Sequence, residues 1–168
     1  MLNFIQMVNY FNYIIFHYQN LITLLGLIFA TGESDGCLRI WDITSQENIT
    51  TFEAHTNDVA SISFSENGYY LATCGLKNPD VKIWDLRKPD LFKTITLNKE
   101  DLHSVEFDYS GNYLGVVGNK THLYDTKTWT QFASFNDHKD VITDIKFGKN
   151  SNYFITTSMD RTMKIYSH

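Results

Sequence analysis

An aromatic residue ends a short β-branched stretch four times along this chain, at nearly constant spacing. The four positions, Trp41, Trp84, Tyr124 and Tyr166, stand 43, 40 and 42 residues apart. An Asp directly follows the first three of them. A period of roughly 40–45 residues with a Trp-Asp signature is typical of a four-stranded propeller blade. Such a repeat builds a binding scaffold, so the pattern points to partners before it points to a reaction.

Short strands separated by turns fill the second repeat. Val59–Phe64 alternates apolar and small polar residues, as a half-buried strand does. The Asn-Gly pair in Ser65–Gly68 suits a tight hairpin. The remaining strands are expected at Tyr70–Cys74, Val81–Asp85 and Phe92–Leu97.

The third and fourth repeats follow the same order. Their strands are expected at Val105–Phe107, Tyr113–Val117, Thr121–Asp125, Val141–Phe147, Tyr153–Ser158 and Thr162–Tyr166. In three repeats the Phe that ends the first strand stands seven positions before an apolar residue of the next strand. These pairs are Phe64 and Leu71, Phe107 and Leu114, and Phe147 and Phe154. Three equal offsets of this kind are hard to obtain by chance.

The first and last repeats are incomplete in sequence. Leu27–Gly32, Leu38–Asp42 and Asn48–Glu53 match the last three strands of a blade, and the first strand is missing or altered. Tyr13–His17 is a candidate for it, about six residues too far upstream. The last repeat ends at His168 with no outer strand. We therefore expect an all-β fold: a partial WD-repeat β-propeller of about three and a half four-stranded blades, or about fourteen strands, with an unpaired edge at each end.

Two regions are expected. Residues 26–168 hold the repeats, at about 26–54, 55–97, 98–136 and 137–168, and residues 1–25 form a hydrophobic extension. Residues 1–32 contain no Asp, Glu, Lys or Arg. The extension lacks the basic start of a secretory signal, and polar residues interrupt it well short of the ~18–20 apolar residues that span a membrane. No membrane association is expected.

Composition argues for one globular domain without a chemical site. The chain has 168 residues, a net charge of −5 and two cysteines that form no CxxC pair. The charge disfavours direct nucleic-acid contact, and lone cysteines fit reduced thiols in a nuclear or cytosolic protein. A glycine-rich phosphate loop, an HExxH motif and paired carboxylates in one hairpin are all absent from the sequence. We expect no catalytic residues, cofactor, metal ligands or small-molecule substrate.

Blades of this type bury a polar network of a His, a Ser or Thr, an Asp and the aromatic residue. The candidates are Thr31, Asp35 and Trp41 in the first repeat, His55, Thr73 and Trp84 in the second, and His138, Thr156, Asp160 and Tyr166 in the fourth. The hairpin of the second repeat is one residue longer, so Asn78 or Asp80 must replace the acid there. The third repeat has Gly115 and Gly118 at the matching positions and is expected to lack the network.

A His, an Asp and a hydroxyl can also form a nucleophilic triad. Here the set recurs once per blade, whereas an active site is not normally built several times around a ring. We therefore interpret these residues as structural, with buried donors and acceptors that satisfy one another.

From Gly26 onward the chain resembles a known family. The stretches GLIFATG, AHTNDVASISFSENGYYLAT, VKIWDLRK, FKTITL, FDYSGNYLGVVG and MDRTMKIYSH are similar to the carboxy-terminal propeller of the pre-mRNA-processing factor 19 family. The resemblance implies a modular ubiquitin ligase with an amino-terminal U-box, a tetramerising coiled coil and a seven-bladed propeller. It also implies action in the nucleus, in a spliceosome-activating complex and in DNA-damage responses.

The resemblance does not reach the whole chain. No U-box and no heptad helix are recognisable in these residues, so we expect no ligase chemistry from this chain itself. Residues 1–25 do not resemble the family, and a retained intron or an incorrectly assigned gene start is one explanation.

The leading hypothesis is a partner- and substrate-docking propeller. Its expected partners are proteins, namely spliceosome-associated complex subunits and ubiquitinated substrates. Loops are expected to carry the contacts, with candidates Glu33, Asp35, Lys77, Asn78, Arg87 and Arg161. An alternative is a substrate receptor of a cullin-RING ubiquitin ligase, because Trp84–Arg87 fits the WDxR box of such receptors. A third possibility is a non-functional product, since half a ring exposes edge strands that aggregate.

Overall fold

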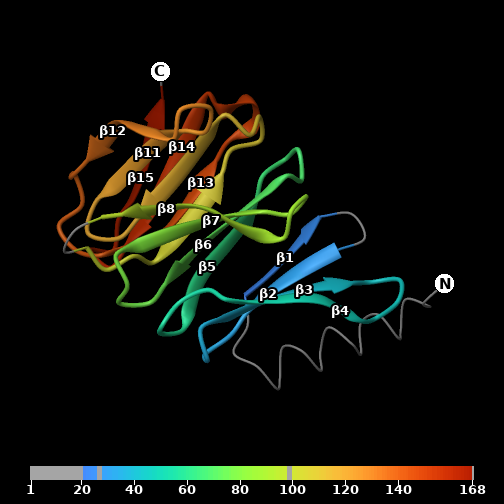
Figure 1. The fold of residues 1–168 in the computed structure, drawn as a ribbon. Coiled ribbons are helices and arrows are strands. Elements are labelled where there is room, and N and C mark those ends of the chain that lie inside the picture. Colours follow the sequence, from blue (N-terminus) through green and yellow to red (C-terminus); the bar gives the residue numbers. More distant parts are fainter. Residues whose placement is uncertain (1–20, 26–27, 98–99, 168) are drawn as a thin grey trace, which may run out of the picture.

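The computed structural model describes residues 21–25, 28–97 and 100–167, which form four antiparallel sheets (Figure 1). Each sheet is a meander, because strands adjacent in the sheet are also adjacent in sequence. The four blades are β1 (Leu21–Leu25), β2 (Ile28–Gly32), β3 (Cys37–Asp42) and β4 (Asn48–Glu53); β5 (Val59–Phe64), β6 (Tyr70–Gly75), β7 (Asp80–Asp85) and β8 (Asp90–Thr96); β9 (Ser104–Phe107), β10 (Tyr113–Val117), β11 (Thr121–Asp125) and β12 (Thr130–Phe135); and β13 (Ile142–Phe147), β14 (Tyr153–Ser158) and β15 (Met163–Ser167). One 3-10 turn, η1 (Lys149–Ser151), lies between β13 and β14. The all-β, partial-propeller prediction is confirmed.

The first blade corrects one expectation. Its first strand is not missing: β1 pairs with β2 along its whole length, from Leu21 opposite Gly32 to Leu25 opposite Ile28. The propeller therefore begins before the boundary that we placed at residue 26. The alternative candidate at 13–17 lies outside the described residues. In the last blade, no fourth strand pairs with β15 among the described residues, as expected.

Inner strands of neighbouring blades run parallel to one another. The Ser61 hydroxyl accepts a hydrogen bond from the Val105 amide (3.1 Å), and the Ser63 hydroxyl accepts one from the Phe107 amide (2.9 Å). Residue numbers rise in the same direction on β5 and β9, so these two strands are parallel. Equivalent loops of successive blades consequently lie on the same face of the molecule.

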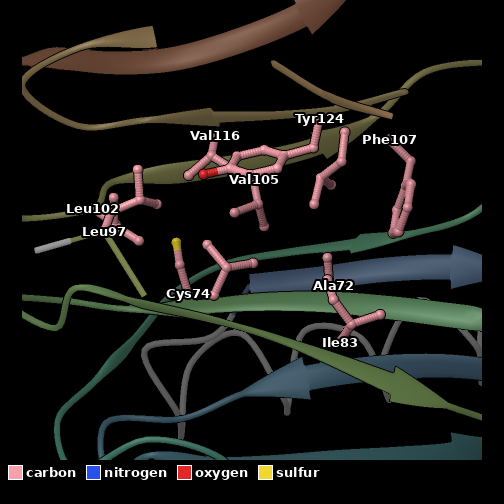
Figure 2. Close-up of a cluster of buried hydrophobic side chains, with 11 residues drawn as sticks. Ala72, Cys74, Ile83, Leu97, Leu102, Val105, Phe107, Val116 and Tyr124 are labelled. Carbon is pink, nitrogen blue, oxygen red and sulfur yellow. The ribbon is translucent and has the colours of Figure 1, made fainter. Parts of the chain in front are cut away.

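The hydrophobic core lies between blades. One cluster joins the second and third blades, where Cys74 and Ile83 face Val105 and Tyr124 (Figure 2). In each later blade the repeat aromatic packs toward the preceding blade; Trp84, for example, lies with its ring 4.6 Å from that of Phe52. Because neighbouring blades cover each sheet, the strands carry apolar residues on both faces of the sheet.

The outer strands share an irregularity that the sequence did not reveal. The pairing of each outer strand shifts by one residue near the repeat aromatic, which leaves Ile49, Phe92 and Phe132 as the inserted residues. A bulge of this kind redirects a side chain. All three residues are exposed, at 55%, 47% and 55%.

Candidate functional site

The fourth blade brings three of its predicted network residues together. His138 Nδ1 lies 3.0 Å from Asp160 Oδ2, and Nε2 lies 2.8 Å from Thr156 Oγ1. The carboxylate also accepts hydrogen bonds from the Thr162 hydroxyl and the Lys139 amide. These bonds, with that from Thr162 foremost, hold the pKa of Asp160 well below its usual range. Since a carboxylate only accepts, the Nδ1–H tautomer of His138 donates to Asp160 and leaves Nε2 to accept the Thr156 proton.

The fourth predicted member, Tyr166, makes no hydrogen bond of normal geometry among the described residues, although Thr156 and Asp137 both influence its hydroxyl. The Tyr166 ring stacks on Phe154, with centroids 4.5 Å apart and planes 8° from parallel. Burial, with a smaller contribution from the charge of Asp137, raises the pKa of Tyr166. Tyr166 therefore occupies the Trp position mainly by ring packing.

In the second blade the hydroxyl is the centre of the network. Thr73 Oγ1 accepts the Trp84 indole N–H (3.1 Å) and lies 2.9 Å from His55 Nε2. The replacement acid is the part that we predicted wrongly. The Asn78 side chain instead accepts the Asp80 amide (2.9 Å).

The missing acid changes the surroundings of His55. The Asp80 carboxylate accepts the Thr96 hydroxyl (2.7 Å), so His55 Nδ1 is left buried without a hydrogen-bond partner among the described residues. Burial, with a smaller contribution from the charge of Lys82, lowers the pKa of His55 to about 4.

The first blade keeps only the Thr–Trp bond. The Trp41 indole N–H donates to Thr31 Oγ1 at 3.0 Å. Asp35 does not join them, which corrects our prediction: it is exposed and accepts the Cys37 amide (2.8 Å) within its own turn. The described part of the first blade offers no histidine for Asp35 to orient, and Asp35 stabilises its own turn instead.

The third blade lacks the network, and the structure gives the steric reason. A Cβ on Gly115 would lie 2.6 Å from Ile145 Cδ1 of the next blade, so a hydroxyl residue there would require the Ile145 side chain to shift. A different pair, missed from the sequence, occupies this blade: His122 Nε2 lies 2.9 Å from Glu100 Oε2, both largely buried. The sequence signal that could have revealed this pair is an acid shortly before the innermost strand together with a His on the third strand of the same blade.

These arrangements stabilise blades and lack the parts of a reaction centre. The described residues contain no group of three or more His, Cys, Asp or Glu placed to hold a metal ion. In the described part of the chain, no helix is long and apolar enough to cross a membrane. Cys37 and Cys74 are free thiols.

The predicted contact residues divide between two faces. Lys77 and Arg161 are exposed in the turns between second and third strands, and Asn78 beside Lys77 is half-buried. Arg87 is exposed in the turn between third and fourth strands, which lies on the opposite face. Glu33 was a wrong choice: it is only 6% exposed, and its carboxylate pairs with Arg39.

An open groove of about 790 Å³ runs along the inner strands β5, β9 and β13. Its lining is polar, with the Ser104 hydroxyl donating to Asp144 (2.7 Å) and Lys146 Nζ lying 2.7 Å from Glu106. Burial raises the pKa of Glu106 despite this ion pair. These two contacts join the inner strands β9 and β13 across the groove.

Four meander sheets packed side by side, with a Thr–Trp hydrogen bond in two of them, define a propeller of repeated blades. The sequence matches the family "WD domain, G-beta repeat" over residues 16–42, 46–85 and 129–167. These matches cover more than half of the chain, and the protein belongs to this family. The first match begins upstream of β1, in agreement with a first blade that starts before residue 26.

The relatives specify the class further. The chain is 41% identical over 149 residues to Pre-mRNA-processing factor 19 of Oryza sativa subsp. japonica and 43% identical over 142 residues to that of Homo sapiens. These alignments cover 85% and 84% of this chain. Pre-mRNA-processing factor 19 homolog 2 of Arabidopsis thaliana is 56% identical over 48 residues, 29% of the chain. The resemblance seen in the sequence is confirmed. The chain spans 28% of the length of the Oryza and human relatives, and 9% of the Arabidopsis one.

Proposed function

We propose that this chain is the partner-docking propeller of a nuclear E3 ubiquitin ligase of the pre-mRNA-processing factor 19 type, acting in pre-mRNA splicing and DNA repair. Its partners are protein subunits of a spliceosome-associated complex and ubiquitinated substrates. The observation that carries the proposal is identity of 41–43% over 84–85% of the chain to relatives with that name. We assign docking to these residues and ubiquitin transfer to the U-box that the resemblance implies.

The fold supports docking through its loops and rim. Most strand amides and carbonyls pair within the sheets, and the clusters of buried apolar side chains lie between blades. What remains for a partner is the set of turns and the outer edge, held by a rigid scaffold. Lys77 and Arg161 present cations on one face, each in a turn that takes positive φ (54° and 65°).

Direct binding tests the proposal. The purified full chain is titrated with individual purified subunits of the splicing complex, and association is measured by calorimetry. We expect a saturable one-to-one complex with at least one subunit. Failure of every subunit to bind a chain that melts cooperatively would overturn the proposal.

A second candidate function rests on Arg87. Its guanidinium is exposed and held in place by Asp85, with Nε to Oδ1 at 2.9 Å and Nη2 to Oδ2 at 2.6 Å. A WDxR arginine fixed at the surface is what a cullin-RING substrate receptor presents to its adaptor. The same calorimetric titration with a cullin adaptor separates the two functions, because only the receptor hypothesis predicts that the adaptor binds.

A further inference from the structure

The sheet of the fourth blade has one face that no other described blade covers. Residues that pair directly across antiparallel strands lie on the same side of a sheet. The side of β14 and β15 that points away from the third blade carries five such residues, which we call the open face: Tyr153, Ile155, Thr157, Met163 and Ile165. The opposite side carries Phe154 and Tyr166, which are packed in one cluster with residues of the third blade.

The positions of the open face are buried in the other three blades. Ile165 directly precedes the repeat aromatic, as Ile83 does in the second blade, where it is fully buried in the cluster that joins the third blade (Figure 2). Met163 matches Val81 in the same way, two positions earlier. The corresponding residues of the first and third blades are at most 6% exposed: Leu38, Ile40, Thr121 and Leu123. Met163 and Ile165, by contrast, are 61% and 62% exposed.

The three interfaces between neighbouring blades show what kind of surface covers such a face. In each of them, residues at these positions share a buried cluster with apolar side chains from the inner strand of the next sheet. Examples are Ile40 with Ile62, Ile83 with Val105, and Leu123 with Ile145. The open face continues this series, so the surface that fits it is a second apolar sheet face. Exposed apolar surface of this kind marks an interaction site.

Two copies of the chain could meet at this face in one of two ways. A head-to-tail contact would place the first blade of one copy on the open face of the other. Among the first-blade residues whose side chains are described, Ile49 is the only large apolar residue that is exposed, and it lies on the outer strand β4. Phe29, at the position of Phe154, is only 1% exposed. A contact between two open faces, related by a two-fold axis, brings together the apolar sheet surface that both copies share.

The charges on this side of the sheet do not oppose such a contact. On β14 and β15, no charged residue lies on the side of the open face. The inner strand β13 adds Asp144 and Lys146, which carry opposite charges and bond to Ser104 and Glu106 of the third blade. The net charge of −5 on each copy opposes association at long range, and salt screens that repulsion.

We propose that the open face binds the open face of a second copy of this chain and forms a closed two-fold dimer. The two sheets lie face to face, with Met163 and Ile165 of each copy buried against the sheet of the other. The turns and outer strands of the first three blades stay accessible in this arrangement. This contact between copies goes beyond the proposed docking of other proteins and does not depend on it.

Sedimentation equilibrium of the purified full chain tests the inference over a concentration series. The chain has a mass of 19.5 kDa, and the measured mass is expected to rise toward twice that value and no further. Met163→Lys is expected to weaken dimerisation about a hundredfold, because a two-fold dimer loses one buried Met side chain from each copy, at about tenfold each. Ile49→Lys is the matched control: the same kind of change at a position that is 55% exposed and outside the open face, with dimerisation unchanged. Both variants are expected to melt like the wild-type chain, and added salt is expected to strengthen the dimer.

Four results would overturn the inference. A mass of 19.5 kDa at every concentration would leave the open face to a sheet of another protein. Equal weakening by Met163→Lys and Ile49→Lys would place the contact elsewhere, and growth beyond two copies would show that the contact does not close. Dissociation by added salt would show that ion pairs, and not apolar faces, hold the copies together.

The same samples separate this inference from the proposed function. A chain that stays monomeric yet binds splicing-complex subunits refutes the dimer and leaves the proposed function standing. A dimer that binds no subunit does the reverse.

Discussion

At the scale of single residues, the blade hydroxyl decides whether a network forms. Thr73 and Thr156 each lie within hydrogen-bond distance of a histidine Nε2, at 2.9 and 2.8 Å, and Thr73 also accepts the indole N–H of Trp84. Residue type and spacing were sufficient to predict these contacts. They were insufficient for the acid of the second blade, because one extra residue in the hairpin lets Asn78 cap its own turn. The same expectation would have followed from the sequence whichever residues stood beside Asn78 in this hairpin.

Asp160→Ala is expected to lower the melting temperature of the chain without affecting partner binding at distant loops. The carboxylate orients His138 and caps two other groups, so its loss leaves donors unpaired. Its pKa is lowered on folding, so the stabilisation is present above its unfolded pKa of about 4 and is lost as pH falls. The gap between wild type and variant, measured by thermal melts, should therefore shrink below about pH 4. Asp58→Ala, at an exposed position without a side-chain partner, should melt like wild type throughout.

His55 predicts a second pH dependence. Its pKa of about 4 in the folded chain lies below the unfolded value of about 6.5, so the unfolded state binds the extra proton between these values. Stability is full above about pH 6.5 and falls by on the order of 3 kcal/mol as pH drops to 4. Denaturant titrations of His55→Gln should show a flatter dependence across this window. A His103→Gln control that flattens it equally would contradict the assignment.

At the scale of elements, the pairing register of the strands could be predicted from the sequence, whereas the β-bulges of the outer strands could not. The three equal offsets in the sequence are pairing partners in the structure: Phe64 opposite Leu71, Phe107 opposite Leu114, and Phe147 opposite Phe154. Strand β1 escaped prediction because residues 1–32 contain no charged residue and lack the longer polar turn that separates the first two strands of later repeats. The outer-strand bulges escaped it because a bulge changes pairing without changing composition.

Ser63→Ala tests how neighbouring blades are joined. The hydroxyl accepts the Phe107 amide at 2.9 Å across the β5–β9 junction, and Ser63 is only 7% exposed. Loss of this acceptor is expected to reduce the free energy of unfolding by about 1–3 kcal/mol. Chemical denaturation measures it, with exposed Ser134→Ala as the control that stays within about 0.5 kcal/mol. A Ser63→Ala variant as stable as the control would mean that this hydrogen bond does not stabilise the junction between the two blades.

At the scale of the whole molecule, the described chain is a run of consecutive blades with an open end. On β15, Met163 and Ile165 are 61% and 62% exposed, and the strand has a partner on one edge only. Exposed apolar edge strands recruit further strands. The parallel inner strands place equivalent turns on the same face, whereas the contact between Trp129 and Tyr70 depends on the positions of side chains from two blades. The spacing of Trp129 and Tyr70 in the sequence gives no indication that their rings are in contact.

Ile165→Lys is expected to reduce self-association without lowering stability. The side chain is exposed, so the substitution removes apolar surface from an edge and adds a charge that opposes strand pairing. Static light scattering across a concentration series measures the effect. Ser134→Lys, at an exposed position on β12, controls for added charge alone. Equal scattering by wild type and Ile165→Lys would locate the association elsewhere.

The central claim is that this chain binds protein partners through its turns and outer strands and does not change them chemically. Hydrogen exchange with mass spectrometry, on the chain alone and in complex with a bound splicing-complex subunit, tests it most directly. The account predicts added protection confined to turns and outer strands, little change in β5, β9 and β13, and a subunit of unaltered mass. Covalent change in the subunit, or protection centred on the inner strands, would contradict it.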